Sequence, residues 1–419
     1  MSDSLRRPVQ FCAVSLFLWM AAWGCTSGQT EREAQPASLE NDVQWLSQPD
    51  LKGRLAGSEG EAKAANYISD RFLESGLAPA GEDGTFLQLF TLSGPMAQAM
   101  DAEGTLARNV AGALRPLQED DEVIIVGAHY DSQGMGGIIS MDHESGEQLH
   151  PGADDNASGT AVLMELARQF SAKPIDKNIL FVAFSGEELG LLGSRHFVRN
   201  MDLRSDRIVA MINLDMVGRM EGNELTIFGT ESAELWSTIL DQAPDDTLRI
   251  ERVPSGSGAS DHTSFFEAGI PVLHYFTGIH PQYHRPEDTV DLLNVAGMHA
   301  IARHVSGVIR ELDTVSASDM EFAGTARRQS PPMDFDGPTL GVLPDYSFGG
   351  DGFRIDGVQP GSAADRAGLL AGDVIVRIGG NRVGDIYGYM EALNRFSAGD
   401  QTVIRIRRNG TEESVDVQF

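Results

Sequence analysis

The chain has 419 residues, of which 41% are hydrophobic and 22% are charged, a composition typical of globular proteins with room for two or three domains. Its formal net charge of −29 argues against nucleic acid as a partner, because the phosphate backbone would be repelled. The two cysteines, Cys12 and Cys25, both lie near the start, so the rest of the chain can form neither a disulfide nor a thiolate metal site. Any metal bound there must use His, Asp and Glu.

The first 24 residues are typical of an export signal. Two arginines precede an apolar run of about fourteen residues, which suits a signal peptide and is shorter than the ~20 residues of a spanning helix. The run ends in the sequence AWGC, which resembles a bacterial lipoprotein box with Cys25 as the lipidated residue. We predict a signal peptide at 1–24, a lipid anchor and tether at 25–40, and an outer-membrane lipoprotein of the cell envelope facing the periplasm or exterior. Cleavage just before the box, which would release a soluble protein, is the alternative.

The next segments alternate between strand-like and helical patterns. Helical spacing follows Asp50 and ends near Gly76, and the runs FLQLFTL and RNVAGAL are strand-like. Further apolar, strand-like runs are EVIIVGAHY, NILFVAFS, RIVAMINLDMVG and IPVLHYF. Helical segments separate or follow them: TAVLMELARQF, ELWSTILDQA and NVAGMHAIARHVSGVIRELD. Apolar strands with helices between them predict an α/β layer fold with a mixed, largely parallel central sheet.

The pattern changes after Asp313. Residues 314–338 are mixed in composition, contain paired prolines and are predicted to be a linker. Residues 339–419 form a compact module whose last part alternates around Asn409-Gly410, which predicts a β-hairpin.

Polar residues follow the predicted strands, at the end of an α/β sheet where ligands bind. These candidates are His129, Asp131, Asp154, Asp155, Glu187, Glu188, Asp215 and His284. A parallel sheet would bring several of them to one edge. Each residue taken singly is more often a surface, capping or hydrogen-bonded group.

Converging carboxylates would repel one another, and a pair of divalent cations turns that repulsion into attraction. Imidazole and carboxylate groups suit zinc, and two zinc ions about 3.5–4 Å apart need a bridging carboxylate. One aspartate of the adjacent pair in GADDNASGT would bridge the ions, and its neighbour need not be a ligand.

The motifs AHYDS, GADDNASGT, FSGEELGLLGS, NLDMVG and YHRPEDT, between Asp50 and Asp313, together resemble the dinuclear zinc aminopeptidases of peptidase family M28. The resemblance implies a three-layer zinc-exopeptidase domain at 41–313 that binds two Zn²⁺. It implies that Asp154 bridges both ions, with a cis peptide bond between Asp154 and Asp155. The other implied ligands are His129 and Asp215 for one ion, and Glu188 and His284 for the other. Asp131 and Asp288 are expected to orient the two histidines.

The same resemblance implies that Glu187 is the general base, which takes a proton from the zinc-activated water and returns it to the leaving amine. The predicted function is removal of N-terminal residues from peptides. Two alternatives stay open: another zinc enzyme of the same fold, such as a glutaminyl cyclase or a carboxypeptidase, and a binding protein without metal.

The module at 339–419 resembles a PDZ domain in its A–AGL–GDVI–I–G spacing. The resemblance implies a glycine loop, Gly350, Asp351, Gly352 and Phe353, that receives the C-terminal carboxylate of another protein. The peptide would then add beside the strand 353–358. The alternative is a module that serves only for packing or assembly.

Overall fold

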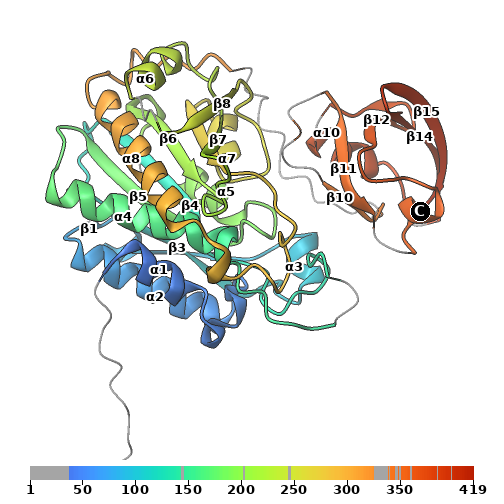
Figure 1. The fold of residues 1–419 in the computed structure, drawn as a ribbon, viewed down its shortest axis with the longest axis horizontal. Helices are drawn as coiled ribbons and strands as arrows, with labels where there is room; N and C mark the ends of the chain where they lie inside the picture. Colours follow the sequence, from blue (N-terminus) through green and yellow to red (C-terminus); the bar gives the residue numbers. More distant parts are fainter. Residues whose placement is uncertain are drawn as a thin grey trace, which may run out of the picture. The chain divides into compact units, whose positions relative to one another are not determined.

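The computed structural model describes residues 37–142, 146–201, 203–243, 247–324, 338, 340–344, 348, 351–358, 361–384, 386–397 and 399–419 (Figure 1). The predicted signal peptide, Cys25 and Gly350 lie outside these residues. Among the helices that the structure describes, none combines the length and apolar character needed to cross a bilayer.

The larger sheet is mixed, and its order is β1-β3-β5-β4-β6-β9-β7-β8, with β2 paired to β3. Its strands are β1 (Ala78–Pro79), β2 (Leu87–Thr91), β3 (Leu106–Ala113), β4 (Val123–His129), β5 (Asn178–Phe184), β6 (Ile208–Leu214), β7 (Glu224–Phe228), β8 (Arg249–Val253) and β9 (Val272–Phe276). The central strands β5, β4, β6 and β9 are mutually parallel, whereas β3 pairs antiparallel with β5, and β7 pairs antiparallel with β9. The parallel centre and the antiparallel flanks confirm the predicted mixed sheet.

Helices cover both faces of this sheet. They are α1 (Leu39–Leu46), α2 (Glu59–Glu74), α3 (Pro95–Ala99), α4 (Gly159–Ala172), α5 (Leu192–Asn200), α6 (Trp236–Gln242), α7 (His262–Glu267) and α8 (Val295–Leu312). One core joins the sheet to α1, α2, α4, α6 and α8, and a second core joins the other face to α5 and α7. Every residue of β4, β5 and β6 is buried, as expected for strands covered on both sides (Figure 1). The three-layer α/β architecture is therefore confirmed.

Local chemistry explains where these helices begin. Ser58 precedes α2 and its side chain accepts a hydrogen bond from the Glu61 N–H at 3.2 Å. Asn294 precedes α8 and accepts from the Gly297 N–H at 2.9 Å. Each cap satisfies a backbone donor that has no partner within its own helix.

The smaller sheet is formed by the C-terminal residues, and its order is β10-β11-β12-β14-β15, with β13 paired to β12. Its elements are β10 (Val342–Pro344), β11 (Phe353–Val358), α9 (Ala363–Arg366), β12 (Val374–Ile378), β13 (Asn381–Arg382), α10 (Ile386–Leu393), β14 (Gln401–Arg408) and β15 (Thr411–Gln418). All the described pairings are antiparallel, and the β14–β15 hairpin turns at Asn409-Gly410 as the sequence predicts.

Candidate metal centre

The candidate site lies at the carboxyl ends of the central parallel strands. His129 is the last residue of β4, and Asp215 directly follows β6. Glu188 lies in the turn after β5, Asp155 in the distorted turn that leads into α4, and His284 in the loop after β9. Residues from five separate parts of the chain therefore meet at one end of the sheet, as expected for an α/β fold.

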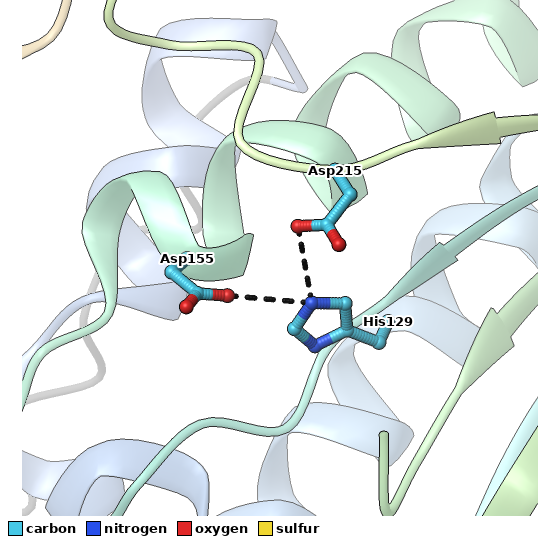
Figure 2. Close-up of side chains that lie close together, drawn as sticks. All are labelled: His129, Asp155 and Asp215. Carbon is cyan, nitrogen blue, oxygen red and sulfur yellow. Dashed lines mark hydrogen bonds and ion pairs between the residues drawn. The ribbon is translucent and has the colours of Figure 1, made fainter. Parts of the chain in front are cut away.

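The first of two groups, the Asp215 cluster, consists of His129, Asp155 and Asp215. The His129 Nε2 atom lies 3.2 Å from Asp215 Oδ1 and 3.3 Å from Asp155 Oδ1 (Figure 2). An imidazole nitrogen can donate only one hydrogen, so it cannot satisfy both carboxylates. The arrangement is suited to a shared cation.

The second group, the Glu188 cluster, consists of Asp155, Glu188 and His284. The His284 Nε2 atom lies 3.1 Å from Asp155 Oδ2 and 3.3 Å from Glu188 Oε2. Asp155 thus presents one carboxylate oxygen to each cluster.

The donor atoms of both clusters fit zinc. Ligands about 2.0–2.1 Å from a tetrahedral ion lie about 3.3 Å from one another. The distances of 3.1–3.3 Å from the two histidine Nε2 atoms to the carboxylates of their clusters match this separation. Nitrogen and oxygen donors are also the ligand types that zinc accepts without cysteine.

The expectation that Asp154 bridges the two positions is wrong, because the structure places Asp155 between them. The Asp154 Oδ1 atom accepts hydrogen bonds from the Gly218 N–H at 2.7 Å and from the Ser158 hydroxyl at 3.0 Å. Its Oδ2 atom lies 3.2 Å from His280 Nε2. Consecutive side chains diverge in this turn, so only one aspartate can face both histidines.

The cis peptide bond lies one residue later than expected, between Asp155 and Asn156. Asn156 joins this turn to the sheet and to α4. Its Oδ1 atom accepts from the Gly159 N–H at 3.0 Å, and its Nδ2 atom donates to the Leu214 carbonyl at 2.9 Å. The amide that follows the aspartate pair therefore satisfies the first N–H of α4 and holds the turn against the end of β6.

Both histidine rings are oriented through Nδ1, which leaves Nε2 facing the carboxylates. His129 Nδ1 lies 3.3 Å from the Asp131 backbone carbonyl and 3.7 Å from its carboxylate. His284 Nδ1 donates to the Ile139 carbonyl at 3.0 Å. The expected role of Asp288 at His284 is therefore corrected: its carboxylate accepts the backbone N–H groups of Asp154 and Asp155 at 2.9–3.1 Å.

The electrostatics favour positive charge at both clusters. The carboxylates of Asp215 and Glu187 raise the pKa of His129 well above its usual value, although burial opposes this. Glu188 and Asp155 likewise raise the pKa of His284 against the effect of burial. Burial and the Asp155 charge raise the pKa of Glu188 to about 8. These raised pKa values show that the clustered carboxylates create a negative potential at the site. A bound cation would balance that negative charge.

Glu187 stands next to the clusters. Its Oε2 atom lies 3.9 Å from His129 Nε2, and its backbone N–H donates to Asp131 Oδ1 at 3.2 Å. Burial raises the pKa of Glu187 well above its usual range, and the Asp215 and Glu188 carboxylates raise it further, against the effect of His129. A carboxyl group with a raised pKa is suited to exchanging protons near neutral pH.

The profile of "Peptidase family M28" matches residues 109–309, and that of "PDZ domain" matches residues 338–419. The chain contains a peptidase family M28 domain and a PDZ domain. Aminopeptidase YwaD of Bacillus subtilis is 32% identical over 220 residues, which cover 49% of this chain and 44% of that protein. The probable lipoprotein aminopeptidase LpqL of Mycobacterium tuberculosis is 29% identical over 242 residues, with 49% and 45% covered. The chain spans less than half the length of these two relatives.

Solved structures resemble the M28 domain in fold. BSAP, a zinc aminopeptidase from Bacillus subtilis, aligns with a TM-score of 0.53 and 20% identity over 69% of this chain and 99% of its own. Glutaminyl cyclase from Bacteroides thetaiotaomicron aligns with a TM-score of 0.54 and 22% identity over 65% and 96%. Both activities therefore occur on structures similar to this one.

Other histidines and Tyr275 of the M28 domain take structural positions. His262 stacks on His274 with ring centroids 4.3 Å apart, and His262 belongs to neither cluster. The Tyr275 hydroxyl lies 3.1 Å from His304 Nδ1, within the core. His150 is held by the Ser140 hydroxyl and the Gln148 carbonyl, each at 2.8 Å.

Sequence reasoning missed Arg54, a fully buried residue beneath the site. Its guanidinium donates to four backbone carbonyls, those of Tyr130 (2.7 Å), Pro151 (2.8 Å), Gly152 (2.9 Å) and Leu46. Burial lowers its pKa to about 10, and the charges of Asp131 and Asp288 limit that decrease. No local sequence pattern predicts this role, because the four acceptor carbonyls come from three separate parts of the chain.

The predicted carboxylate loop of the PDZ domain is also corrected. The Gly352 N–H already donates to the Gly384 carbonyl at 3.1 Å, Asp351 pairs with Arg382 at 2.9 Å, and the Phe353 ring stacks on Tyr389. Strand β11 lies inside the sheet, between β10 and β12. A peptide strand needs a free edge, and on this side of the described sheet the edge strand is β10.

Proposed function

We propose that the chain is a zinc aminopeptidase that removes N-terminal residues from peptides. The observation that carries this proposal is the pair of histidine–carboxylate clusters that share Asp155, with Glu187 3.9 Å from His129. Each cluster would hold one Zn²⁺, so the proposed content is two ions per chain.

Bound zinc ions would lower the pKa of a water toward neutrality and polarise the scissile carbonyl. The protein groups around the site have three tasks. The two histidines present Nε2 to the site, Asp155 holds both positions together, and Glu187 exchanges protons. None of these side chains needs to form a covalent bond to the substrate.

Glu187 is proposed as the general base. It takes a proton from the water whose oxygen adds to the peptide carbonyl carbon, and it delivers that proton to the departing amine nitrogen as the C–N bond breaks. Its raised pKa favours holding the proton between these two steps. Both products, a free amino acid and a peptide shortened by one residue, are thereby formed with the proton balance closed.

A glutaminyl cyclase is the second candidate, because a cyclase shares the fold at a TM-score of 0.54. In cyclisation the substrate's own α-amine attacks its side-chain amide and no water is consumed. A base in the position of Glu187 serves either reaction, so the geometry of the clusters does not separate the two.

The deciding experiment incubates the full chain with three peptides, one with a free N-terminus, one acetylated, and one beginning with glutamine. The products are identified by mass, before and after chelation and zinc return. Release of the first residue from the two peptides with a free α-amino group, and not from the acetylated peptide, is the expected result, and it should be abolished by chelator and restored by zinc. Loss of ammonia from the glutamine peptide without cleavage would replace the proposal by a cyclase. Shortening of the acetylated peptide from its C-terminus would indicate a carboxypeptidase, and an inactive chain without metal would indicate a binding protein.

We further propose the domain limits 41–313 for the peptidase, 314–338 for the linker and 339–419 for the PDZ domain.

Export and lipidation at Cys25 are proposed from the AWGC sequence, and the similarity to a probable lipoprotein aminopeptidase supports a cell-envelope location. Labelling of cells with a clickable fatty acid tests the anchor. Label on the wild-type chain and none on Cys25→Ser is expected, and equal label on both chains would contradict it.

The PDZ domain is proposed to bind the C-termini of peptides by adding a strand beside β10 (Val342–Pro344), since β11 has partners on both sides. Calorimetry of the full chain, carrying Glu187→Gln to prevent hydrolysis, compares peptides with free and amidated C-termini. Binding of the free form alone is expected. Equal binding of both, or of neither across a diverse library, would leave a packing or assembly role.

A further inference from the structure

The loop that follows β4 contains a buried residue, Gln133, that the proposed chemistry does not use. The Gly134 N–H donates to the Gly53 carbonyl at 2.9 Å, and the Gly134 carbonyl accepts from the His150 N–H at 2.9 Å. A Cβ at Gly134 would lie 2.8 Å from the Leu55 side chain, and its φ is +66°. Close packing therefore fixes the start of the loop.

The far end of the same loop holds His284. The Ile139 carbonyl accepts from the His284 ring at 3.0 Å, and the Met141 N–H donates to the His284 carbonyl at 2.9 Å. The loop thus fixes both the backbone and the ring of one member of the Glu188 cluster.

Gln133 contacts a second member. Its Nε2 group donates to Glu188 Oε1 at 3.0 Å, and the residue is only 2% exposed. The other oxygen of Glu188, Oε2, is the atom that lies 3.3 Å from His284 Nε2. The amide therefore occupies one carboxylate oxygen and leaves the other for the cluster.

We propose that Gln133 is a positioning residue for the Glu188 cluster, which sets Glu188 to offer a single oxygen to the ion held there. The inference rests on the proposed function, because it concerns a bound metal. The Asp215 cluster is oriented differently, through the Asp131 carbonyl at His129 Nδ1. Gln133 should consequently affect the binding of the ion at the Glu188 cluster and not the binding of the ion at the Asp215 cluster.

The test removes the amide while keeping the length of the side chain, as Gln133→Met. Metal-free protein is titrated with Co²⁺ and Zn²⁺, followed by calorimetry, elemental analysis and the visible spectrum of Co²⁺. We expect one of the two equivalents to bind with unchanged affinity and spectrum. The other should bind about 10–100-fold more weakly, the usual effect of removing a group that orients a metal ligand.

Gln169→Met is the matched control, because the Gln169 amide also donates to a glutamate, Glu165 Oε1 at 2.9 Å, on α4. It should bind both equivalents as the wild type does. Gln133→Asn withdraws the amide by one methylene and should reproduce the selective loss. In a Glu188→Ala background, Gln133→Met should cause no further change.

The outcomes separate this inference from the proposed function. A wild-type chain that binds no metal overturns both. If Gln133→Met binds both equivalents with the affinities of the wild type, the role of Gln133 is overturned and the proposed function stands. Equal weakening of both equivalents in Gln133→Met and Gln133→Asn also overturns it, because the effect would then be a general loss of structure.

Discussion

The Asp215 cluster and the Glu188 cluster share one carboxylate but are built differently. His129 and Asp215 adjoin β4 and β6, two buried strands paired in parallel, with Gly127 opposite Asn213. Glu188 lies in a turn, and His284 lies in a loop with a left-handed φ of +54°. The backbone of the sheet therefore places the first pair, whereas loops and side chains place the second.

The difference shows how one site can combine a fixed part with an adjustable part. Strand ends in a covered sheet cannot move without disrupting the core. Loops depend on individual hydrogen bonds, such as that from the His284 ring to the Ile139 carbonyl and that from the Gln133 amide to Glu188. We expect substitutions around the Glu188 cluster to change metal binding with little loss of stability, and the following experiments test the contrast.

The largest effect is expected at Asp155, the residue common to both clusters. Asp155→Asn should weaken the binding of both ions and abolish activity. A carboxamide has only one oxygen, so it cannot bind two cations. Asp154→Asn is the matched variant and should retain both ions, since the Asp154 carboxylate is engaged by Gly218 and Ser158. Elemental analysis after gel filtration distinguishes the two. Loss of both ions in Asp154→Asn and their retention in Asp155→Asn would show that Asp154 is the shared ligand.

Glu187→Gln tests whether proton transfer is separate from metal binding. Turnover should fall by about 10²–10⁴-fold, the usual contribution of a general acid–base group. Both ions should stay bound with wild-type stoichiometry, because Glu187 belongs to neither cluster. Steady-state kinetics and elemental analysis on one sample provide the measurement, and turnover within threefold of the wild type would remove Glu187 from its role.

Arg54→Met should destabilise the peptidase domain as a whole, whereas Gln133→Met should act on the Glu188 cluster alone. Loss of the guanidinium removes a donor from four carbonyls, of which only that of Gly152 is seen to keep another, the Ala157 N–H at 3.1 Å. The free energy of unfolding should therefore fall by about 3–5 kcal/mol. Arg115→Met is the comparison, because Arg115 donates to the carbonyls of Ile175 and Asp176 in more exposed surroundings. It should cost about 1 kcal/mol. Urea denaturation of the metal-free proteins measures both, and equal costs would contradict the importance of the buried position.

The smallest effect concerns His274, which packs beside the Asp215 cluster. Burial lowers its pKa to about 4, so below pH 6.5 the unfolded chain binds a proton that the folded chain does not. The free energy of unfolding should therefore fall as pH drops, by about 1.6 kcal/mol between pH 6.5 and 5 from this residue. His274→Phe keeps an aromatic ring and should remove that part of the slope.

His262 titrates in the same direction, because burial lowers its pKa well below the usual value, and its share of the slope should remain in His274→Phe. Unfolding curves at several pH values in the presence of chelator provide the comparison. An unaltered slope in His274→Phe would show that the pKa of His274 is the same in the folded and the unfolded chain.

Much of the fold and the types of residue at the site follow from the sequence. Continuous apolar runs define β4, β5, β6 and β9, since strands covered on both faces must be apolar throughout. Because polar residues follow these strands, the sequence also indicates which side chains meet at the end of the sheet. His129, Glu188, Asp215 and His284 do lie in the two clusters.

Only the tertiary structure decided which aspartate faces both histidines, which loop holds His284, and which strand of the PDZ domain forms an edge. Asp154 and Asp155 are chemically identical and adjacent, so the backbone of their turn alone determines where each carboxylate points. The roles of Arg54 and Gln133 depend on partners far away in the chain. Strand β11 is not the edge strand that the sequence predicted, because β10 pairs with it. Residue type and periodicity act locally, whereas direction and partnership are fixed only when distant segments pack together.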